Sequence, residues 1–289
     1  MLGNLLVSTL MSASVYAMLA VGFSLTFGVA RIINLAHTAF YMVASYIIFT
    51  ATMKMGLPLY VGVVAAVSLV VLLAMVTYKV LVDPMREHET TVLILTIGVA
   101  LVLQELMFLW FGGYFRSVPT AVEGFTTLLG VRVSYQYVLT ICVLIVTLAL
   151  VWLLLMKTRL GLAIRATAQD REIANVMGMS DSRTATITVG IAAALAAIAG
   201  AIVAPLFIIE PRIWLSPLTV VLAISVLGGL GSLKGSILGA VIIALSENLV
   251  VFLVPQGAFF KGAFSLLIMI VVLLIRPEGL YGVAFEEER

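Results

Sequence analysis

The chain has 289 residues, of which 63% are hydrophobic and 10% are charged, and its mean hydropathy is +1.23. This composition lies far outside that of soluble domains, so we expect a protein embedded in a lipid bilayer. The net charge of +2 is too small, and too widely spread over short loops, for a nucleic acid to be the partner.

The apolar segments predict an all-α fold, a polytopic transmembrane helical bundle in which residues 1–289 form a single domain. A hydrocarbon core about 30 Å thick requires roughly 20 apolar residues for each crossing helix. The first segment has no basic stretch before it, so we predict a retained helix and not a signal peptide. The predicted spans are residues 5–30, 36–54, 58–82, 90–111, 135–156, 184–209, 217–254 and 262–275.

Residues 31–37 (Arg-Ile-Ile-Asn-Leu-Ala-His) separate the first two spans and do not form an ordinary polar loop. Asn34, His37 and Thr38 cluster at this break. Polar groups at membrane depth usually face protein or a water-filled cavity, so these three residues are candidates for a pathway or gate. The alternative is that they cap helix ends and bond to neighbouring carbonyls.

Two further pairs of polar residues lie inside apolar spans, Gln104 with Glu105 and Glu247 with Asn248. An uncompensated acid in lipid is costly, so we expect each carboxylate to face the bundle interior or an interhelical partner. Gln104, Glu105 and Glu247 are thus candidates for lining a pathway, with structural pairing as the alternative. The three tryptophans fall near span ends, which is typical of interfacial anchors: Trp110, Trp152 and Trp214.

The seventh segment is too long for one crossing and is interrupted by residues 227–235 (Leu-Gly-Gly-Leu-Gly-Ser-Leu-Lys-Gly). Glycine disfavours helix and Lys234 would be costly in lipid. We therefore predict a Gly-rich broken or re-entrant segment, and about eight crossings in all. Gly228, Gly229 and Gly231 are candidates for a gating hinge, with close helix packing as the alternative.

Residues 157–183 hold eight of the 30 charged residues in the chain. Asp170 is a good N-cap, Glu172 would lie in the first helical turn, and Gly178 stands where a left-handed residue ends a helix. These signals predict a short helix over about 171–177. Its apolar face would comprise Ile173, Val176 and Met177, which either dock on a partner or rest on lipid headgroups.

The distribution of Lys and Arg predicts that residues 157–183 are cytoplasmic, with the N-terminus outside and the C-terminus inside. In this orientation eleven of the 16 basic residues lie on the inner side and five on the outer side. The outer five are Lys54, Arg116, Arg132, Arg212 and Lys261.

Catalytic and metal-binding patterns are missing from the sequence. It has two histidines and one cysteine, Cys142, so neither a Cys/His zinc spacing nor an intramolecular disulfide is available. The GGLGS run lacks the lysine spacing of a phosphate loop. We therefore predict a chain that is not an enzyme, holds no metal and does not hydrolyse ATP.

Three ordered segments, residues 22–49, 158–179 and 226–240, resemble the LivH-type permease subunits of branched-chain amino acid ABC importers. LIRPEGLYG at residues 274–282 resembles their C-terminal ending. The chain departs from the family where it has Leu35 and Thr38 in place of the common Phe and Gly, and Val220 where many members have a polar or basic residue.

The resemblance implies a permease in the prokaryotic cytoplasmic (inner) membrane that works with a second, LivM-like permease, two cytoplasmic ABC ATPases and an external solute-binding protein. The chain itself would bind no cofactor, since ATP and Mg would be used by the ATPases. Residues 157–183 would then be the cytoplasmic coupling loop, with contacts from Arg165, Ala168, Asp170, Glu172, Ile173, Val176, Met177 and Gly178.

Two alternatives stay open at this point. One is a permease on the same scaffold for urea, short amides or another small polar solute. The other is an ion-coupled secondary transporter, which should carry coupling carboxylates near the membrane midplane.

Overall fold

The computed structural model describes residues 2–120, 122–128, 130–276 and 279–281. Two strands, β1 (Phe125–Leu128) and β2 (Val131–Ser134), pair antiparallel as a short hairpin that the sequence analysis did not anticipate. The remainder of the regular structure is helical, which confirms the predicted fold class. The helices are α1 (Leu2–Ala30), α2 (His37–Phe49), α3 (Leu59–Thr77), α4 (Glu89–Phe111), α5 (Tyr135–Lys157), α6 (Arg159–Gln169), α7 (Arg171–Val176), α8 (Asp181–Val203), α9 (Leu215–Gly228), α10 (Leu233–Leu253) and α11 (Gly257–Ile275).

Within the described residues, seven helices are long and apolar enough to cross a bilayer. Helix α2 gains length from a π-helical turn, Thr50–Lys54. Helix α9 has 14 residues, so it extends about 21 Å and is shorter than a hydrocarbon core of about 30 Å. It is therefore a partial crossing that ends at the Gly-rich break, and the bundle agrees with the predicted architecture of about eight crossings.

Two predicted boundaries are wrong for identifiable reasons. The span predicted over 184–209 ends at Val203, because Pro205 lacks the N–H that would continue the helix. The span predicted over 262–275 begins at Gly257. Lys261 can lie inside this helix because its ammonium group pairs with Glu247 of α10 at 3.2 Å.

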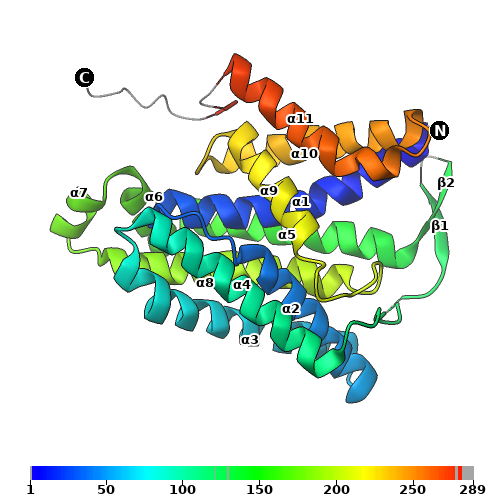
Figure 1. Cartoon of the computed structure of the whole chain (residues 1–289), viewed down its shortest axis with the longest axis horizontal. Helices are drawn as coiled ribbons and strands as arrows, with labels where there is room; N and C mark the ends of the chain where they lie inside the picture. Colours follow the sequence, from blue (N-terminus) through cyan, green and yellow to red (C-terminus); the bar gives the residue numbers. More distant parts are fainter. Residues whose placement is uncertain (1, 121, 129, 277–278, 282–289) are drawn as a thin grey trace.

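Helices α1 and α8 run through the middle of the bundle, while α3 and α11 lie at opposite edges (Figure 1). In the most apolar 18-residue stretch of each helix, 72% of the stretch is buried in α8 and 67% in α1, against 6% in α11. Small residues allow this close packing: Gly200 of α8 lies against the backbone of Tyr41 in α2, and the Ser45 hydroxyl donates to the Gly200 carbonyl at 3.0 Å. The hairpin lies at one end of the bundle, the hairpin end, and α6 and α7 lie at the other, the α7 end (Figure 1).

Candidate functional site

The break between α1 and α2 is a folded turn stabilised by its own polar groups. Arg31 adopts a positive φ of 53°, and the Asn34 side-chain oxygen accepts from the Ala36 N–H at 3.1 Å. The Leu35 N–H donates to the Thr96 hydroxyl of α4 at 3.2 Å. Backbone groups that leave the helix thus find partners at membrane depth, which is what a break there requires.

His37 and Thr38 begin α2 and point into the bundle. The His37 Nε2 lies 3.0 Å from the Leu19 carbonyl of α1, and the ring fills the space above Gly22, where a Cβ would clash with it. Thr38 is fully buried, and its hydroxyl has no partner among the described residues. The structure therefore brings Asn34, His37 and Thr38 together, and Asn34 makes the capping contact named as the alternative.

The Gly-rich break between α9 and α10 combines close packing with special backbone conformations. Gly228 and Gly235 meet so closely that a Cβ on either would overlap the other's backbone. Gly229 and Gly231 have φ values of 94° and 82°, which side chains rarely tolerate. Both the packing and the conformational reasons for glycine are therefore present at this break.

Two neighbours hold the Gly-rich break in place. The hydroxyls of Ser24 in α1 and Ser236 in α10 are 2.6 Å apart. The C-terminal segment returns to the end of α9, where the N–H groups of Leu280 and Tyr281 donate to the carbonyls of Leu227 and Gly228 at 2.8 and 3.0 Å. The family-like ending of the sequence thus completes the hydrogen bonding of α9.

Glu247 is buried among α1, α10 and α11. Its carboxylate accepts from the Tyr16 hydroxyl at 2.8 Å and from the Ser265 hydroxyl, and it pairs with Lys261. This is the structural pairing offered as the alternative for Glu247, and Glu247 has no contact with the α1–α2 break. Its proposed pathway role finds no support in the geometry.

Gln104 and Glu105 point in different directions from α4. Gln104 is buried and accepts from the indole N–H of Trp214 at 2.9 Å. Trp214 is 1% exposed, so its predicted role as an interfacial anchor is wrong: the indole lies inside the bundle because Gln104 satisfies its donor. Glu105 is exposed on the helix surface and does not face the interior of this chain.

The short helix predicted over about 171–177 is present as α7. The Asp170 carboxylate caps it by accepting from the Ile173 N–H at 3.0 Å, and Gly178 ends it with a φ of 86°. Its apolar side chains are left uncovered: Ile173, Val176 and Met177 are 63%, 87% and 73% exposed. The amphipathic helix α6, which contains Arg165 and Ala168, was not predicted as a separate element.

Helices α6 and α7 are tied to the turn after α1. The Arg171 guanidinium donates to the Val29 carbonyl at 2.9 Å, and the Arg31 guanidinium donates to the Ala168 carbonyl at 3.4 Å. Burial lowers the pKa of Arg171 below its ordinary value, and the nearby charges of Arg86 and Arg31 act in the same direction. These two hydrogen bonds connect α6 and α7 to the end of α1 and to the turn that follows it.

A charged network that the sequence analysis missed lies beside α7. Arg86, in the turn between α3 and α4, pairs with Asp181 at the start of α8 at 2.6 Å. Asp83 accepts from Lys79 at 2.7 Å and from the Ser182 hydroxyl at 2.6 Å. Burial is the largest single influence and disfavours the charge of Arg86, but Asp181, Tyr78 and Asp83 together outweigh it, so the pKa of Arg86 is raised. The signal in the sequence was the opposite charges at the ends of these spans.

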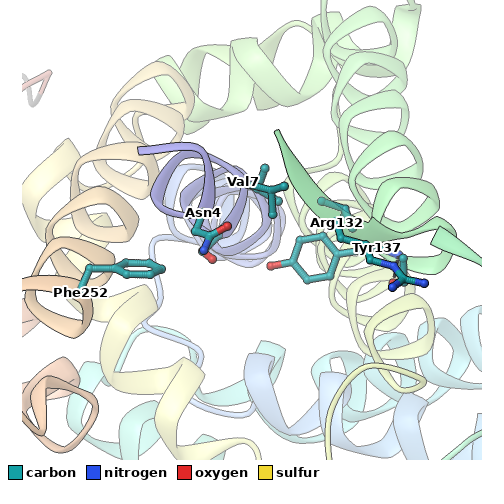
Figure 2. A pocket seen from close by; sticks show the side chains of 9 residues that line it. Asn4, Val7, Arg132, Tyr137 and Phe252 are labelled. Carbon is teal, nitrogen blue, oxygen red and sulfur yellow. Dashed lines mark hydrogen bonds between the residues drawn. The ribbon is translucent and has the colours of Figure 1, made fainter. Parts of the chain in front are cut away.

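A cavity of about 330 Å³ opens at the hairpin end, far from α7. Asn4 and Val7 come from α1, Tyr137 from α5 and Phe252 from α10, and the Tyr137 hydroxyl points toward Asn4 across the cavity (Figure 2). Sequence reasoning did not single out these residues, because only the fold brings them together. No group of His, Cys, Asp or Glu suited to a metal ion occurs in the part of the chain that the structure describes.

Known proteins match the chain over nearly its whole length. A family model described as "branched-chain amino acid transport system / permease component" matches residues 5–273. The high-affinity branched-chain amino acid transport system permease protein BraD of Pseudomonas aeruginosa is 32% identical, over 96% of this chain and 94% of BraD. The corresponding LivH protein of Salmonella typhimurium is 30% identical, over 93% and 92% of the two chains.

More distant proteins also match the chain over most of its length. A probable branched-chain amino acid transport permease protein LivH of Methanocaldococcus jannaschii is 27% identical over 95% of this chain and 91% of its own. The solved structure of PsaBC from Streptococcus pneumoniae in complex with Fab has a TM-score of 0.55 at 14% identity, covering 96% and 94% of the two chains, and bears on the fold alone. Because the family model covers all the helices from α1 to most of α11, the chain belongs to the family of permease components of branched-chain amino acid transport systems.

Proposed function

We propose that this chain is the membrane-spanning permease subunit of an ATP-binding-cassette importer, and that it translocates branched-chain amino acids delivered by an external solute-binding protein. Family membership supports the transport role. The observation that carries the coupling to ATP is the uncovered apolar face of α7, formed by Ile173, Val176 and Met177. Three such side chains on one capped, protruding helix form a surface for a protein partner.

The proposed partner of α7 is a cleft in a cytoplasmic ATPase subunit. The polar contacts of Asp170 and Gly178 determine where the helix starts and stops, so its apolar face has a defined direction. When ATP binding moves the ATPases, α7 would move with them and act on the α1–α2 break through Arg171 and Arg31. The site residues that we assign to coupling are Arg165, Ala168, Asp170, Glu172, Ile173, Val176, Met177 and Gly178.

The assembled importer would contain two ATPases, which use ATP and Mg, and a second, LivM-like permease. This chain supplies no cofactor site in the proposal. The excess of Lys and Arg near the α7 end supports its location on the cytoplasmic side of a prokaryotic inner membrane, with the hairpin end and the N-terminus outside.

The proposed pathway runs beside the two helix breaks. Asn34, His37 and Thr38 lie at the start of α2, and Gly228, Gly229 and Gly231 allow the end of α9 to bend. Gln104 would border the path from α4, whereas Glu105 lies on the outer surface of that helix. A path at helix breaks is chemically reasonable, because unwound backbone and polar side chains can replace the water around an amino acid.

The test is reconstitution of this permease with its ATPases, companion permease and binding protein. Val176→Asp places an unpaired charge in the apolar contact and should reduce the recovered ATPase and amino acid uptake roughly tenfold. Gly178→Val should act similarly, because valine disfavours the positive φ that directs α7. Val122→Asp, at an exposed position of the hairpin end, is the control and should leave both quantities unchanged.

Normal ATPase recovery and uptake in both α7 variants would mean that α7 is only a solvated connector. Uptake by this chain alone, driven by a proton or sodium gradient, would overturn the importer proposal. Competition with leucine, urea and acetamide in the same assay identifies the substrate class, and inhibition by urea or acetamide but not by leucine would contradict the proposed substrate.

A further inference from the structure

One charged side chain lies on the outer surface of a crossing helix, well inside its length. Glu105 is six residues, or about 9 Å, before the end of α4 at Phe111, and it is exposed. The side-chain amide of Gln104 donates to a carboxylate oxygen of Glu105 at 3.2 Å. In the described part of the chain no Lys or Arg lies within ion-pair distance of Glu105.

The same surface of α4 contains an unexplained glycine. Gly98 lies seven residues before Glu105 and therefore on the same side of the helix. Nothing lies within 4 Å of the place where its Cβ would be, so the packing of this chain gives no reason for a residue that weakens a helix. Val102 lies between Gly98 and Glu105 and is 60% exposed. Leu109 lies one turn beyond Glu105 and is 76% exposed. We call Gly98, Val102, Glu105 and Leu109 the α4 stripe.

A bilayer is a poor environment for the α4 stripe. Ionisable side chains inside a membrane usually face other protein or water, and a glycine on a helix surface allows a second backbone to approach closely. The outer surface of α3 shows the contrast: Leu69, Leu72 and Val76 are exposed and wholly apolar, as expected for contact with lipid. Figure 1 shows α4 on the near side of the bundle, in front of α8, with no other helix drawn in front of it.

We propose that the α4 stripe is the contact surface for a transmembrane helix of the companion permease, which packs against Gly98 and presents a hydrogen-bond donor or a basic side chain to Glu105. This inference rests on the proposed function, since it needs a second permease. The charge selects a non-identical partner, because a two-fold contact of two α4 stripes would place two Glu105 carboxylates against each other. The buried hydrogen bond from Trp214 to Gln104 holds α4 against the bundle, so the stripe lies on a rigid element.

The proposal is tested in the assembled complex with photocross-linking. In a Cys142→Ala background, Val102→Cys is labelled with benzophenone maleimide and illuminated. Leu69→Cys on α3 is the matched control. Leu69 lies nearly as far from the hairpin end of α3 as Val102 lies from the hairpin end of α4. We expect a cross-link to the companion permease from Val102→Cys at least tenfold stronger than from Leu69→Cys. Equal yields, or a cross-link to a second copy of this chain, would overturn the inference.

Substitutions in the stripe provide the second readout. Gly98→Leu and Glu105→Leu make the surface more lipid-like, so the variants should insert normally yet lose the companion permease several-fold on purification. Glu105→Gln should retain more of it, because the amide can still accept a hydrogen bond. Full recovery of the companion in both leucine variants would place the stripe in lipid. A wild-type chain that purifies and transports without any second permease would instead contradict the proposed function itself.

Discussion

At the scale of single residues, Thr38 poses a clear question. It is fully buried at the start of α2, and its hydroxyl has no partner within the described residues. A buried hydroxyl without a partner is unfavourable, so such a group is retained when another conformation satisfies it. In the proposed transport cycle that conformation is the one in which the α1–α2 break opens and Thr38 meets water or the substrate.

Thr38→Val removes the hydroxyl and nearly keeps the volume, so the folded resting state should be as stable as the wild type or more stable by up to about 1 kcal/mol. Uptake in vesicles should nevertheless fall several-fold. The measurements are thermal unfolding in detergent and the initial uptake rate. Unchanged uptake would show that Thr38 is a packing residue. A bulkier variant such as Thr38→Trp is uninformative, because the site has no room for the ring.

At the scale of helices, α11 depends on one polar cluster for its position. Its side chains are mostly exposed, and its two buried residues are Gly257 and Ser265. Ser265 and Lys261 both bind the Glu247 carboxylate of α10, and Tyr16 of α1 donates to the same group. This cluster specifies the height and rotation at which α11 packs on α10.

Lys261→Met leaves the buried Glu247 carboxylate without its cation, and we expect the free energy of unfolding to fall by about 2 kcal/mol. The double variant Lys261→Met/Glu247→Gln should recover most of this loss, because the neutral amide still accepts from Tyr16. Thermal unfolding of the two variants in detergent measures both effects. Equal stability of the single and double variants would contradict the assignment of a compensating charge to Lys261.

At the scale of the whole molecule, the charged network of Asp83, Arg86 and Asp181 joins the turn after α3 to the start of α8, next to α7. The Asn175 side chain of α7 also accepts from the Asp181 N–H at 3.1 Å. In the proposed transport cycle, this network would make α7, α3 and α8 move together when an ATPase pulls on α7.

Asp181→Asn breaks the ion pair with Arg86 but leaves the backbone contact to Asn175 and the shape of the side chain. We expect ATPase recovery to stay normal while the uptake per ATP hydrolysed falls roughly two- to tenfold, because the motion is transmitted less completely. Simultaneous measurement of ATP hydrolysis and uptake in proteoliposomes checks this. Ser182→Ala, which removes a neighbouring hydroxyl but no charge, is the milder comparison. Unchanged coupling in Asp181→Asn would limit the network to stability.

Much of this protein followed from local properties of the sequence. Long apolar segments, the two breaks and the capped helix α7 each depend on residues that are close in the chain: lipid selects helix over about 20 residues, Asp170 caps its own helix, and Gly178 supplies its own positive φ. For the same reason the ends of most helices agree with the predicted spans.

The directions of individual side chains were decided only by the tertiary structure. In helices that are apolar on all sides, hydrophobic periodicity does not tell which face meets protein and which meets lipid. Sequence alone therefore placed Trp214 at an interface, left open whether Glu105 faces the bundle interior or an interhelical partner, and missed the contacts of Asp83 and Asp181. Those outcomes depend on pairings between residues far apart in the chain, such as Trp214 with Gln104, which form only when the bundle is assembled.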